Sequence, residues 1–395
     1  MMIRAVLGNP NHPEYGVATI PFPIPRDQYA HCVELLEALE IGDAVKADCK
    51  VERIDSFYTV LKRTEMLTVN VEELNYLAKR LDSFDTGEAA QFQAMAHKLE
   101  LFELKDLINL TFCCQQATVI TDFSDLAAIG RNHYMNLHGG SASVDELNAL
   151  DDTGISRQLI ENGGGTVTPY GVVYDNGMKL EQIYDGRFFP CYYYEPNAIT
   201  VAVTAKSEPE DTEHITWLFL PMIQEEIGRA LLRGGIPDPS EIRLSLEDSW
   251  LPHEVLDLLD MDHVDISELN ALVQALDEFS DMSIRKYAAA AVMARPHTTE
   301  QAKHLAENLD LFDFAPSAST PEEYGKYMIQ KSGRFEYDEN LDAFYDYEKY
   351  GTERMNEEDG MFTDRGYIAY KGYISMEEVM NGSQSNCMEM GGFSR

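Results

Sequence analysis

The chain has 395 residues, of which 44% are hydrophobic and 10% aromatic, so it can bury two or three cores and is too apolar for an acidic disordered tail. Its 68 acidic residues outnumber 31 basic ones and give a net charge of −37. This balance disfavours nucleic acid and anionic membranes as partners and favours a basic protein.

The start of the chain sets a pattern that returns later. Residues 3–24 have the pattern of a strand, a polar loop and a second strand running into proline, and "NVEELNYLAKRLDSFD" (70–85) that of a capped amphipathic helix. "DISELNALVQALDEFS" (265–280) repeats that helix 195 positions later. The residues that recur are Asn70, Glu73, Leu74, Leu77, Leu81 and Phe84, matched by Asp265, Glu268, Leu269, Leu272, Leu276 and Phe279. Asn70 with Glu73, and Asp265 with Glu268, predict a capping box at the start of each helix, in which the cap side chain and the glutamate both bind free backbone amides.

The same offset of 195 holds between Gly130 and Gly325 and between Gly171 and Gly366. Several blocks in one order at one offset indicate a tandem duplication of domain-sized modules. We predict a first copy over 1–190, an aromatic junction over 191–198 at which the copies pack, a second copy over 199–374 and a flexible tail over 375–395.

The second copy gives the clearest element pattern. It predicts strands at 199–205, 213–221 and 241–250, a helix at 222–233, further helices within 253–333 and short strands near 361–374. The predicted class is α+β: elongated, duplicated modules, each with small mixed or antiparallel sheets and a helical middle.

Next comes an acidic and aromatic segment near the end of the second copy. Carboxylates on rigid elements can accept the Arg and Lys donors that otherwise hold phosphate, so these carboxylates are candidates for contact with a basic partner. The candidate carboxylates are Glu336, Asp338, Glu339, Asp342, Asp346, Glu348, Glu353, Glu357, Glu358 and Asp359, with Asp277, Glu278, Asp82 and Asp85 elsewhere. The candidate interface residues are Phe344, Tyr345, Tyr347 and Tyr350. A plain solvated surface and an adaptation to high salt are the alternatives.

Enzymatic motifs are weak. "DDTGIS" (151–156) contains one Asp-Thr-Gly triplet without a second, "PHEVLD" has Asp257 where a zinc helix needs histidine, and "ENGGGT" (161–166) lacks the lysine of a phosphate loop. His133 and His138 have the wrong spacing for one helical face. We therefore expect no catalytic residues, no metal and no cofactor.

The sequence also bounds the compartment. It has no apolar run of 18 residues, no secretory signal, and six cysteines without CxxC spacing. These features predict a cytoplasmic protein with reduced thiols.

"ELNALVQALDEF", "EEYGKYM" and "LDAFYDYEKYG" (341–351) followed by "GMFTDRGYI" resemble the ArdA antirestriction family, most faithfully in the second copy. The resemblance implies a non-catalytic DNA mimic that occupies the DNA-binding groove of type I restriction-modification enzymes, in their methyltransferase core. Ordinary members carry one copy and dimerise, whereas this chain has two and carries "LDDTGISRQL" in place of the first motif.

Alternatives remain open for the target and for the oligomer. The target is a type I enzyme or another DNA-binding protein, such as a different defence complex, a nucleoid protein or a transcription factor. A carboxylate-based hydrolase is the alternative from another class. The chain is a monomer or a dimer through the second copy.

Overall fold

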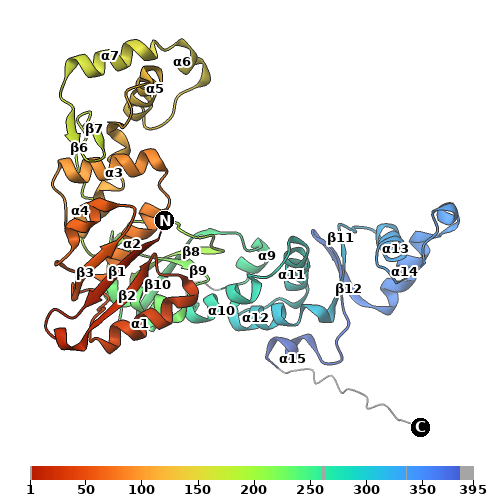
Figure 1. Ribbon diagram of the computed structural model, residues 1–395. Helices are drawn as coiled ribbons and strands as arrows, with labels where there is room; N and C mark the ends of the chain where they lie inside the picture. Colours follow the sequence, from red (N-terminus) through yellow and green to blue (C-terminus); the bar gives the residue numbers. More distant parts are fainter. Residues whose placement is uncertain (1, 260–262, 335, 383–395) are drawn as a thin grey trace, which may run out of the picture. The chain divides into compact units, whose positions relative to one another are not determined.

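The computed structural model describes residues 2–259, 263–334 and 336–382 (Figure 1). It divides into two compact units. Unit 1 comprises Met1–Pro196, Glu208–Trp217 and Ile223–Pro237, and unit 2 comprises Asn197–Ser207, Leu218–Met222 and Asp238–Arg395. The units are therefore not contiguous in sequence, because the segments Glu208–Trp217 and Ile223–Pro237 belong to unit 1 although they lie between segments of unit 2.

Unit 1 contains two sheets, the helices α1 to α7 of the first half and, in addition, α8. Its strands are β1 (Ile3–Gly8), β2 (Val17–Phe22), β3 (Cys49–Asp55), β4 (Thr68–Val69), β5 (Thr118–Ile120), β6 (Thr166–Thr168) and β7 (Gly171–Tyr174). Its α-helices are α1 (Tyr29–Ala38), α2 (Val71–Asp82), α3 (Thr86–Lys98), α4 (Leu104–Leu110), α5 (Leu126–Leu137), α6 (Val144–Ala149), α7 (Asp152–Asn162) and α8 (Gln224–Arg233). Short 3-10 turns are η1 (Pro13–Tyr15), η2 (Arg26–Gln28), η3 (Thr59–Thr64) and η4 (Cys114–Gln116).

The sheets of unit 1 follow from alternating burial along the strands. The first runs β2-β1-β3-β4 and the second β5-β7-β6, with antiparallel neighbours. In β1, Ile3, Ala5 and Leu7 are buried while Arg4 is exposed, which places one face of the sheet on the core. Helices α2, α3 and α4 contribute their apolar stripes to the same core.

Unit 2 repeats these ingredients. Its strands are β8 (Ile199–Ala205), β9 (Thr216–Leu220, of which Leu218–Leu220 count with this unit), β10 (Ile242–Ser249), β11 (Phe312–Pro316), β12 (Asp359–Thr363) and β13 (Gly366–Tyr370). Its α-helices are α9 (His253–Leu256), α10 (Ile266–Leu276), α11 (Asp281–Ala294), α12 (Thr299–Glu307), α13 (Pro321–Gln330), α14 (Tyr347–Glu357) and α15 (Met376–Met380). The 3-10 turns are η5 (Pro239–Glu241), η6 (Leu309–Leu311) and η7 (Glu339–Phe344).

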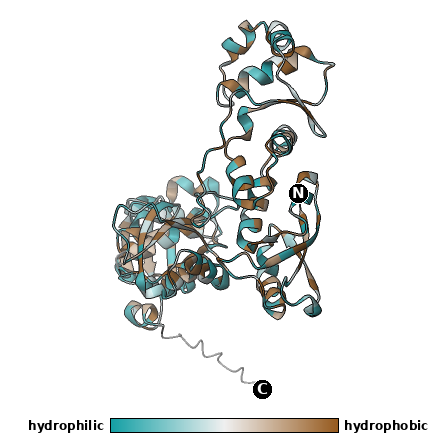
Figure 2. Ribbon diagram, turned by 90° about the vertical axis from the view of Figure 1, so that its left-hand side faces the viewer, coloured by the Kyte–Doolittle hydropathy of each residue, from teal (hydrophilic) through white to brown (hydrophobic). Residues whose placement is uncertain are grey.

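The sheets of unit 2 run β10-β8-β9 and β11-β13-β12, and the paired registers that define them are antiparallel. Several small antiparallel sheets among many helices confirm the predicted α+β class. The helices interleave hydrophilic and hydrophobic residues (Figure 2), and in the described part of the chain none is long and apolar enough to cross a membrane.

The two halves of the sequence have similar orders of elements and share several local contacts. The orders β2-β1-β3 and β5-β7-β6 in unit 1 correspond to β9-β8-β10 and β11-β13-β12 in unit 2. Asn75 on α2 accepts a hydrogen bond from the Ile24 amide at 2.9 Å, and Asn270 on α10 accepts one from the Met222 amide at 2.8 Å. The hydroxyls of Thr168 and Thr363 each donate to a carbonyl three residues on, both at 2.8 Å.

The predicted helix caps are confirmed, but the reciprocal half of the capping pattern is wrong. Asn70 accepts from the amides of residues 72 and 73, and Asp265 from those of residues 267 and 268. Glu73 instead accepts from the Tyr184 hydroxyl at 2.7 Å, and Glu268 from the Thr299 hydroxyl at 2.7 Å. Tertiary partners thus take the glutamates that a local pattern assigns to the cap.

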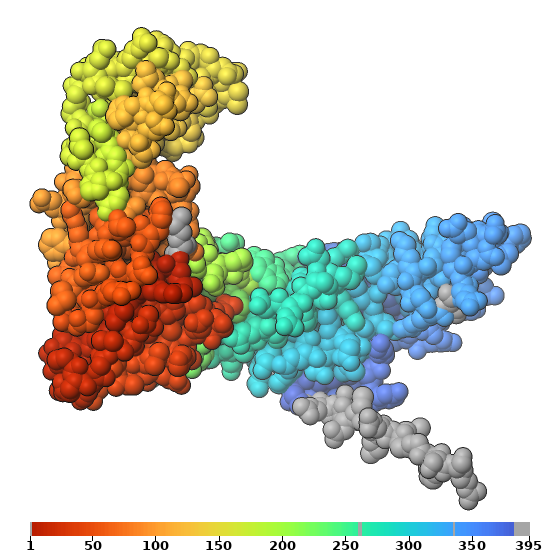
Figure 3. All heavy atoms as spheres, viewed as in Figure 1, coloured from red at the N-terminus to blue at the C-terminus, as the bar shows by residue number. Residues whose placement is uncertain are grey.

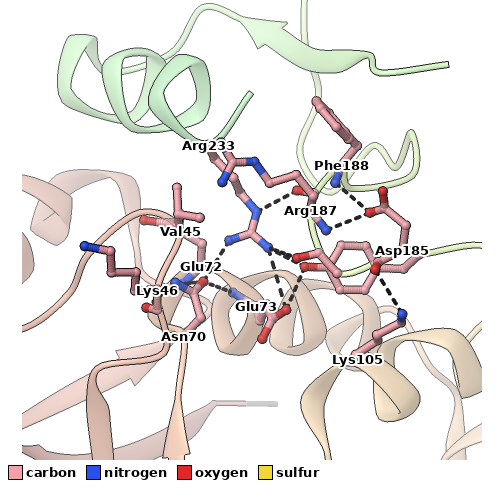
Figure 4. A network of polar contacts seen from close by, with 12 residues as sticks. Val45, Lys46, Asn70, Glu72, Glu73, Lys105, Asp185, Arg187, Phe188 and Arg233 are labelled. Atoms are coloured by element: carbon pink, nitrogen blue, oxygen red, sulfur yellow. Dashed lines mark hydrogen bonds and ion pairs between the residues drawn. The ribbon is translucent and has the colours of Figure 1, made fainter. Parts of the chain in front are cut away.

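Helix α8 is held in unit 1 by a buried arginine (Figure 4). Arg233 is 4% exposed and donates to the carbonyls of Ala44 and Arg187, both at 2.9 Å, and to the Asn70 side chain at 3.0 Å. Its guanidinium also donates to the Tyr184 hydroxyl and lies 3.6 Å from Glu73. Burial raises the pKa of Glu73, although the Tyr184 hydrogen bond and Arg233 act in the opposite direction.

The predicted junction packs on α2 within unit 1. The hydroxyl of Tyr192 donates to the Lys79 carbonyl at 3.2 Å, and that of Tyr194 to Asp82 at 2.7 Å. Tyr192 and Tyr194 are half-buried and hold the segment against α2, and this packing agrees with the apolar composition of the segment.

The segment predicted as a flexible tail contains a capped helix. Helix α15 is capped by Ser375, buries Val379 and Met380, and receives a contact from His304 at the Met380 carbonyl. Residues 383–395 of that prediction lie outside the described residues.

Candidate functional site

The acidic segment 336–359 is carried by a close pair of helices in unit 2. It spans η7, α14 and the first residue of β12, and α14 packs against α13. A Cβ placed on Gly325 of α13 would lie 2.0 Å from the Tyr347 carbonyl, and one on Gly351 of α14 would lie 1.8 Å from the Pro321 carbonyl. Both glycines are therefore required by backbone approach, and they fix the position of the helix that carries the charges. Light-blue atoms of this part of the chain lie at the surface in the space-filling view (Figure 3).

Asp342 organises the aromatic residues of the segment. Its Oδ1 accepts hydrogen bonds from the hydroxyls of Tyr347 at 2.6 Å and Tyr337 at 2.7 Å, and from the Gln330 amide at 2.9 Å. The hydrogen bonds from Tyr347 and Tyr337 lower the pKa of Asp342. This carboxylate ties α13, η7 and α14 together, so its charge also has a structural task.

Glu358 has a similar task at the other end of α14. It accepts from the Tyr324 hydroxyl at 2.6 Å and forms an ion pair with Arg354. Tyr324 is buried, and burial together with the Glu358 contact raises its pKa. The charged end of α14 is thereby linked to the small apolar core of Ala315, Tyr324 and Tyr367.

The other predicted carboxylates of the segment are exposed: Glu336, Asp338, Glu339, Asp346, Glu348, Glu353, Glu357 and Asp359. Asp338 caps η7 by accepting from the Asn340 amide, and Asp346 caps α14 by accepting from the Lys349 amide. A cap orients its carboxylate at the positive end of a helix, so these charges have defined directions.

The predicted carboxylates outside the segment differ among themselves. Asp277 and Glu278 are exposed at the end of α10, and Asp85 is exposed where it caps α3 with Glu88. Asp82 is half-buried and accepts from Tyr194. The structure places Asp82 and Asp85 in unit 1 and the others in unit 2.

The four predicted interface aromatics differ in how far they are exposed to solvent. Phe344 is 83% exposed at the end of η7, whereas Tyr350 packs against the core around Tyr324. Tyr345 is half-buried, and its ring centroid lies 5.7 Å from that of Tyr347. Only Phe344 among them is a largely exposed side chain.

Sequence reasoning missed Tyr337, Gln330 and Arg354 as organising residues. The partners of Gln330 and Tyr337 are set by packing of α13 on α14, which no local pattern indicates, whereas Arg354 pairs with Glu357 and Glu358 three and four residues further along the chain. The repeat at an offset of 195 did indicate Gly325, because Gly130 is its equivalent in the first half. A Cβ placed on Gly130 would lie 1.7 Å from the Asp152 carbonyl in unit 1.

The residues of the weak enzymatic motifs make ordinary structural contacts. Asp151 caps α7 by accepting from the Gly154 amide, His133 contacts the Thr118 hydroxyl at 2.9 Å, and His138 contacts the Tyr134 carbonyl at 2.7 Å. Among the described residues, no group of three or more His, Cys, Asp or Glu side chains is placed to hold a metal ion.

The fold and the site define an acidic α+β protein whose carboxylates are displayed on capped helices and fastened by tyrosines. Residues 213–369 match the family model described as antirestriction protein (ArdA). The resemblance is thus confirmed for residues 213–369, which are similar to the ArdA antirestriction family. No curated protein matches the chain.

Proposed function

We propose that this protein is a DNA mimic that inhibits type I restriction-modification enzymes by occupying the DNA-binding groove of their methyltransferase core. The observation that carries the proposal is that the carboxylates of segment 336–359 have two different roles, exposure to solvent and structural hydrogen bonding. Eight carboxylates are exposed on η7, α14 and their flanks, while Asp342 and Glu358 accept hydrogen bonds that hold those elements in place.

Electrostatics gives such a surface its affinity. A groove that binds DNA presents Arg and Lys side chains, and carboxylates accept from these donors as phosphate oxygens do. Association of two oppositely charged surfaces also releases counterions. A fixed surface has the further advantage that less side-chain and loop ordering is needed on binding.

The test is inhibition of a purified type I enzyme by the full chain. We expect stoichiometric inhibition, relieved by excess DNA, with the logarithm of the inhibition constant linear and steep in the logarithm of salt concentration. A flat salt response contradicts the electrostatic mechanism, and turnover of a substrate by the protein contradicts mimicry altogether.

The second candidate function is mimicry against another DNA-binding target. The net charge of −37 is not confined to the matched region, so a wider set of basic grooves is attracted. Pull-down from a host with several restriction systems distinguishes the two: recovery of type I subunits supports the first proposal, and recovery of a different DNA-binding protein supports the second.

We also propose that the two halves are tandem copies of one module. The common order of elements, the shared sheet orders and the paired Asn75 and Asn270 contacts support it. Copy one occupies 1–190 and copy two 199–374 in this proposal, with 191–198 between them.

A homodimer through the second copy is the oligomeric form we propose, because Phe344 is 83% exposed within the motif. Light scattering should give twice the chain mass of 44.6 kDa. Phe344→Asp is the informative variant, since Phe344 is peripheral, whereas Tyr347 donates to Asp342 and its loss disturbs the fold. A Phe344→Asp protein that stays dimeric moves the interface elsewhere.

A further inference from the structure

Unit 2 contains a cationic cavity that the acidic surface does not explain. The cavity has a volume of about 260 Å³. It lies among α11, β11, α13, the turn after α13 and the residue that follows β13. Its charged lining consists of Lys286, Arg334, Lys371 and Asp313, three cations against one carboxylate, in a chain whose net charge is −37.

Two of the cations are already satisfied by Asp313. Arg334 pairs with this carboxylate at 2.6 Å and Lys371 at 2.9 Å. Burial acts to raise the pKa of Asp313, but the hydrogen bonds from Arg334 and Lys371 hold it below its ordinary value. Asp313 is therefore ionised and fully engaged at neutral pH.

Lys286 differs from the other two. Its side chain is half-buried, and among the described residues it makes no hydrogen bond or ion pair. Burial and then repulsion from Lys371 lower its pKa, against the attraction of Asp313 and Asp310. A desolvated ammonium without an acceptor is unfavourable, and an anion that entered the cavity would supply that acceptor.

The rest of the lining consists of aromatic side chains, two methionines and Ser332. Phe314 and Tyr327 are half-buried at the cavity, Phe312 and Tyr324 are buried behind it, and Met282 is 49% exposed at the rim. Ligand pockets combine mostly apolar walls with a few placed polar groups, and pockets for drug-sized ligands have volumes of roughly 300 Å³ or more. This smaller cavity suits one ring carrying one anionic group.

We propose that this cavity binds a small organic anion, a phosphate monoester or a carboxylate on a single aromatic ring, with Lys286 as the principal charge contact. The site is distinct from the mimic surface, because its lining contains none of the predicted carboxylates, and the two are linked through Tyr324, which lines the cavity and donates to Glu358. Arg334 and Lys371 complete the anion-binding side, and Phe314 with Tyr327 contact the ring.

The experiment is a titration of the full chain at low ionic strength with phenyl phosphate, benzoate and inorganic phosphate, each in a separate run. Binding is measured by calorimetry or by ligand-observed NMR. We expect saturable one-to-one binding of phenyl phosphate or benzoate, and the tighter of the two assigns the anionic group. Inorganic phosphate should bind about tenfold more weakly, because it lacks the ring contact. Equal binding of inorganic phosphate, or no saturation with any probe, overturns the proposal.

Variants locate the binding. Lys286→Gln should lower affinity by about tenfold or more, the factor that one charge-assisted hydrogen bond carries. Lys303→Gln is the matched control, since that lysine lies on α12 and pairs with Glu307 at 3.7 Å. If thermal unfolding shows that Lys286→Gln is misfolded, Lys371→Gln replaces it, because that side chain is 50% exposed. Unchanged affinity in a folded variant refutes the assignment.

Discussion

Replacing Gly325 with alanine tests whether close backbone approach positions the acidic helix. The added Cβ would lie 2.0 Å from the Tyr347 carbonyl, so α13 and α14 must separate by about 1.4 Å to reach ordinary contact at 3.4 Å. Overpacking of this kind costs about 1–3 kcal/mol, while the gain in helix propensity is about 1 kcal/mol. We expect a net destabilisation of up to about 2 kcal/mol.

Gly228→Ala is the matched control. Gly228 lies inside α8, and a Cβ there meets nothing within 4 Å, so this substitution should stabilise the protein by about 0.5–1 kcal/mol. Urea unfolding followed by circular dichroism gives both signs, and hydrogen exchange over 321–357 locates the effect. A Gly325→Ala protein as stable as wild type, with unchanged protection of α14, refutes the close-packing argument.

Three further substitutions test the framework and the surface. Arg233→Met should destabilise unit 1 by about 3–5 kcal/mol, because it leaves Glu73 without its buried cation, and urea unfolding with exchange over α2 and α8 measures this. The lowered pKa of Asp342 means that its stabilisation is present above the unfolded pKa and lost as pH falls through the folded pKa. The near-UV tyrosine signal of wild type should therefore weaken below about pH 4, and Asp342→Asn should lack that transition. Glu357→Lys should change the inhibition constant by less than about threefold, since the charge is exposed and screened, and a complete loss with an intact fold indicates a discrete site.

Local patterns predicted the elements because they depend on residues close in sequence. The stripe Leu74, Leu77 and Leu81 is buried as its helical spacing requires, and Asn70 caps the helix as its side chain allows. Strand β8 has the predicted bounds 199–205, and the helix predicted at 222–233 is observed at Gln224–Arg233. The sequence therefore suffices to predict an element where the role of a side chain depends on its own helix or strand.

Contacts between distant elements were not predictable in this way. Asp342 was predicted as a surface charge, but its three donors come from α13, from α14 and from the segment before η7. The membership of α8 in unit 1 depends on Arg233 reaching carbonyls near residues 44 and 187, far away in sequence. Such partners are fixed by packing, and composition and periodicity carry no information about them.

The two halves of the chain are unequal in both charge and framework, and this inequality bears on which half acts. Segment 336–359 has ten carboxylates and two cations, whereas the corresponding segment 141–164 has five carboxylates and one cation. The position of Asp342 corresponds to Leu147, and that of Tyr347 to Asp152, so the first half has no equivalent of the tyrosine–carboxylate cluster. Asp152 pairs with Arg131 at 3.1 Å, which reduces the charge of α7 further. A surface that imitates phosphate needs both density and fixed direction, and of these two corresponding segments 336–359 combines them. We therefore expect segment 336–359, and not segment 141–164, to contact a basic groove.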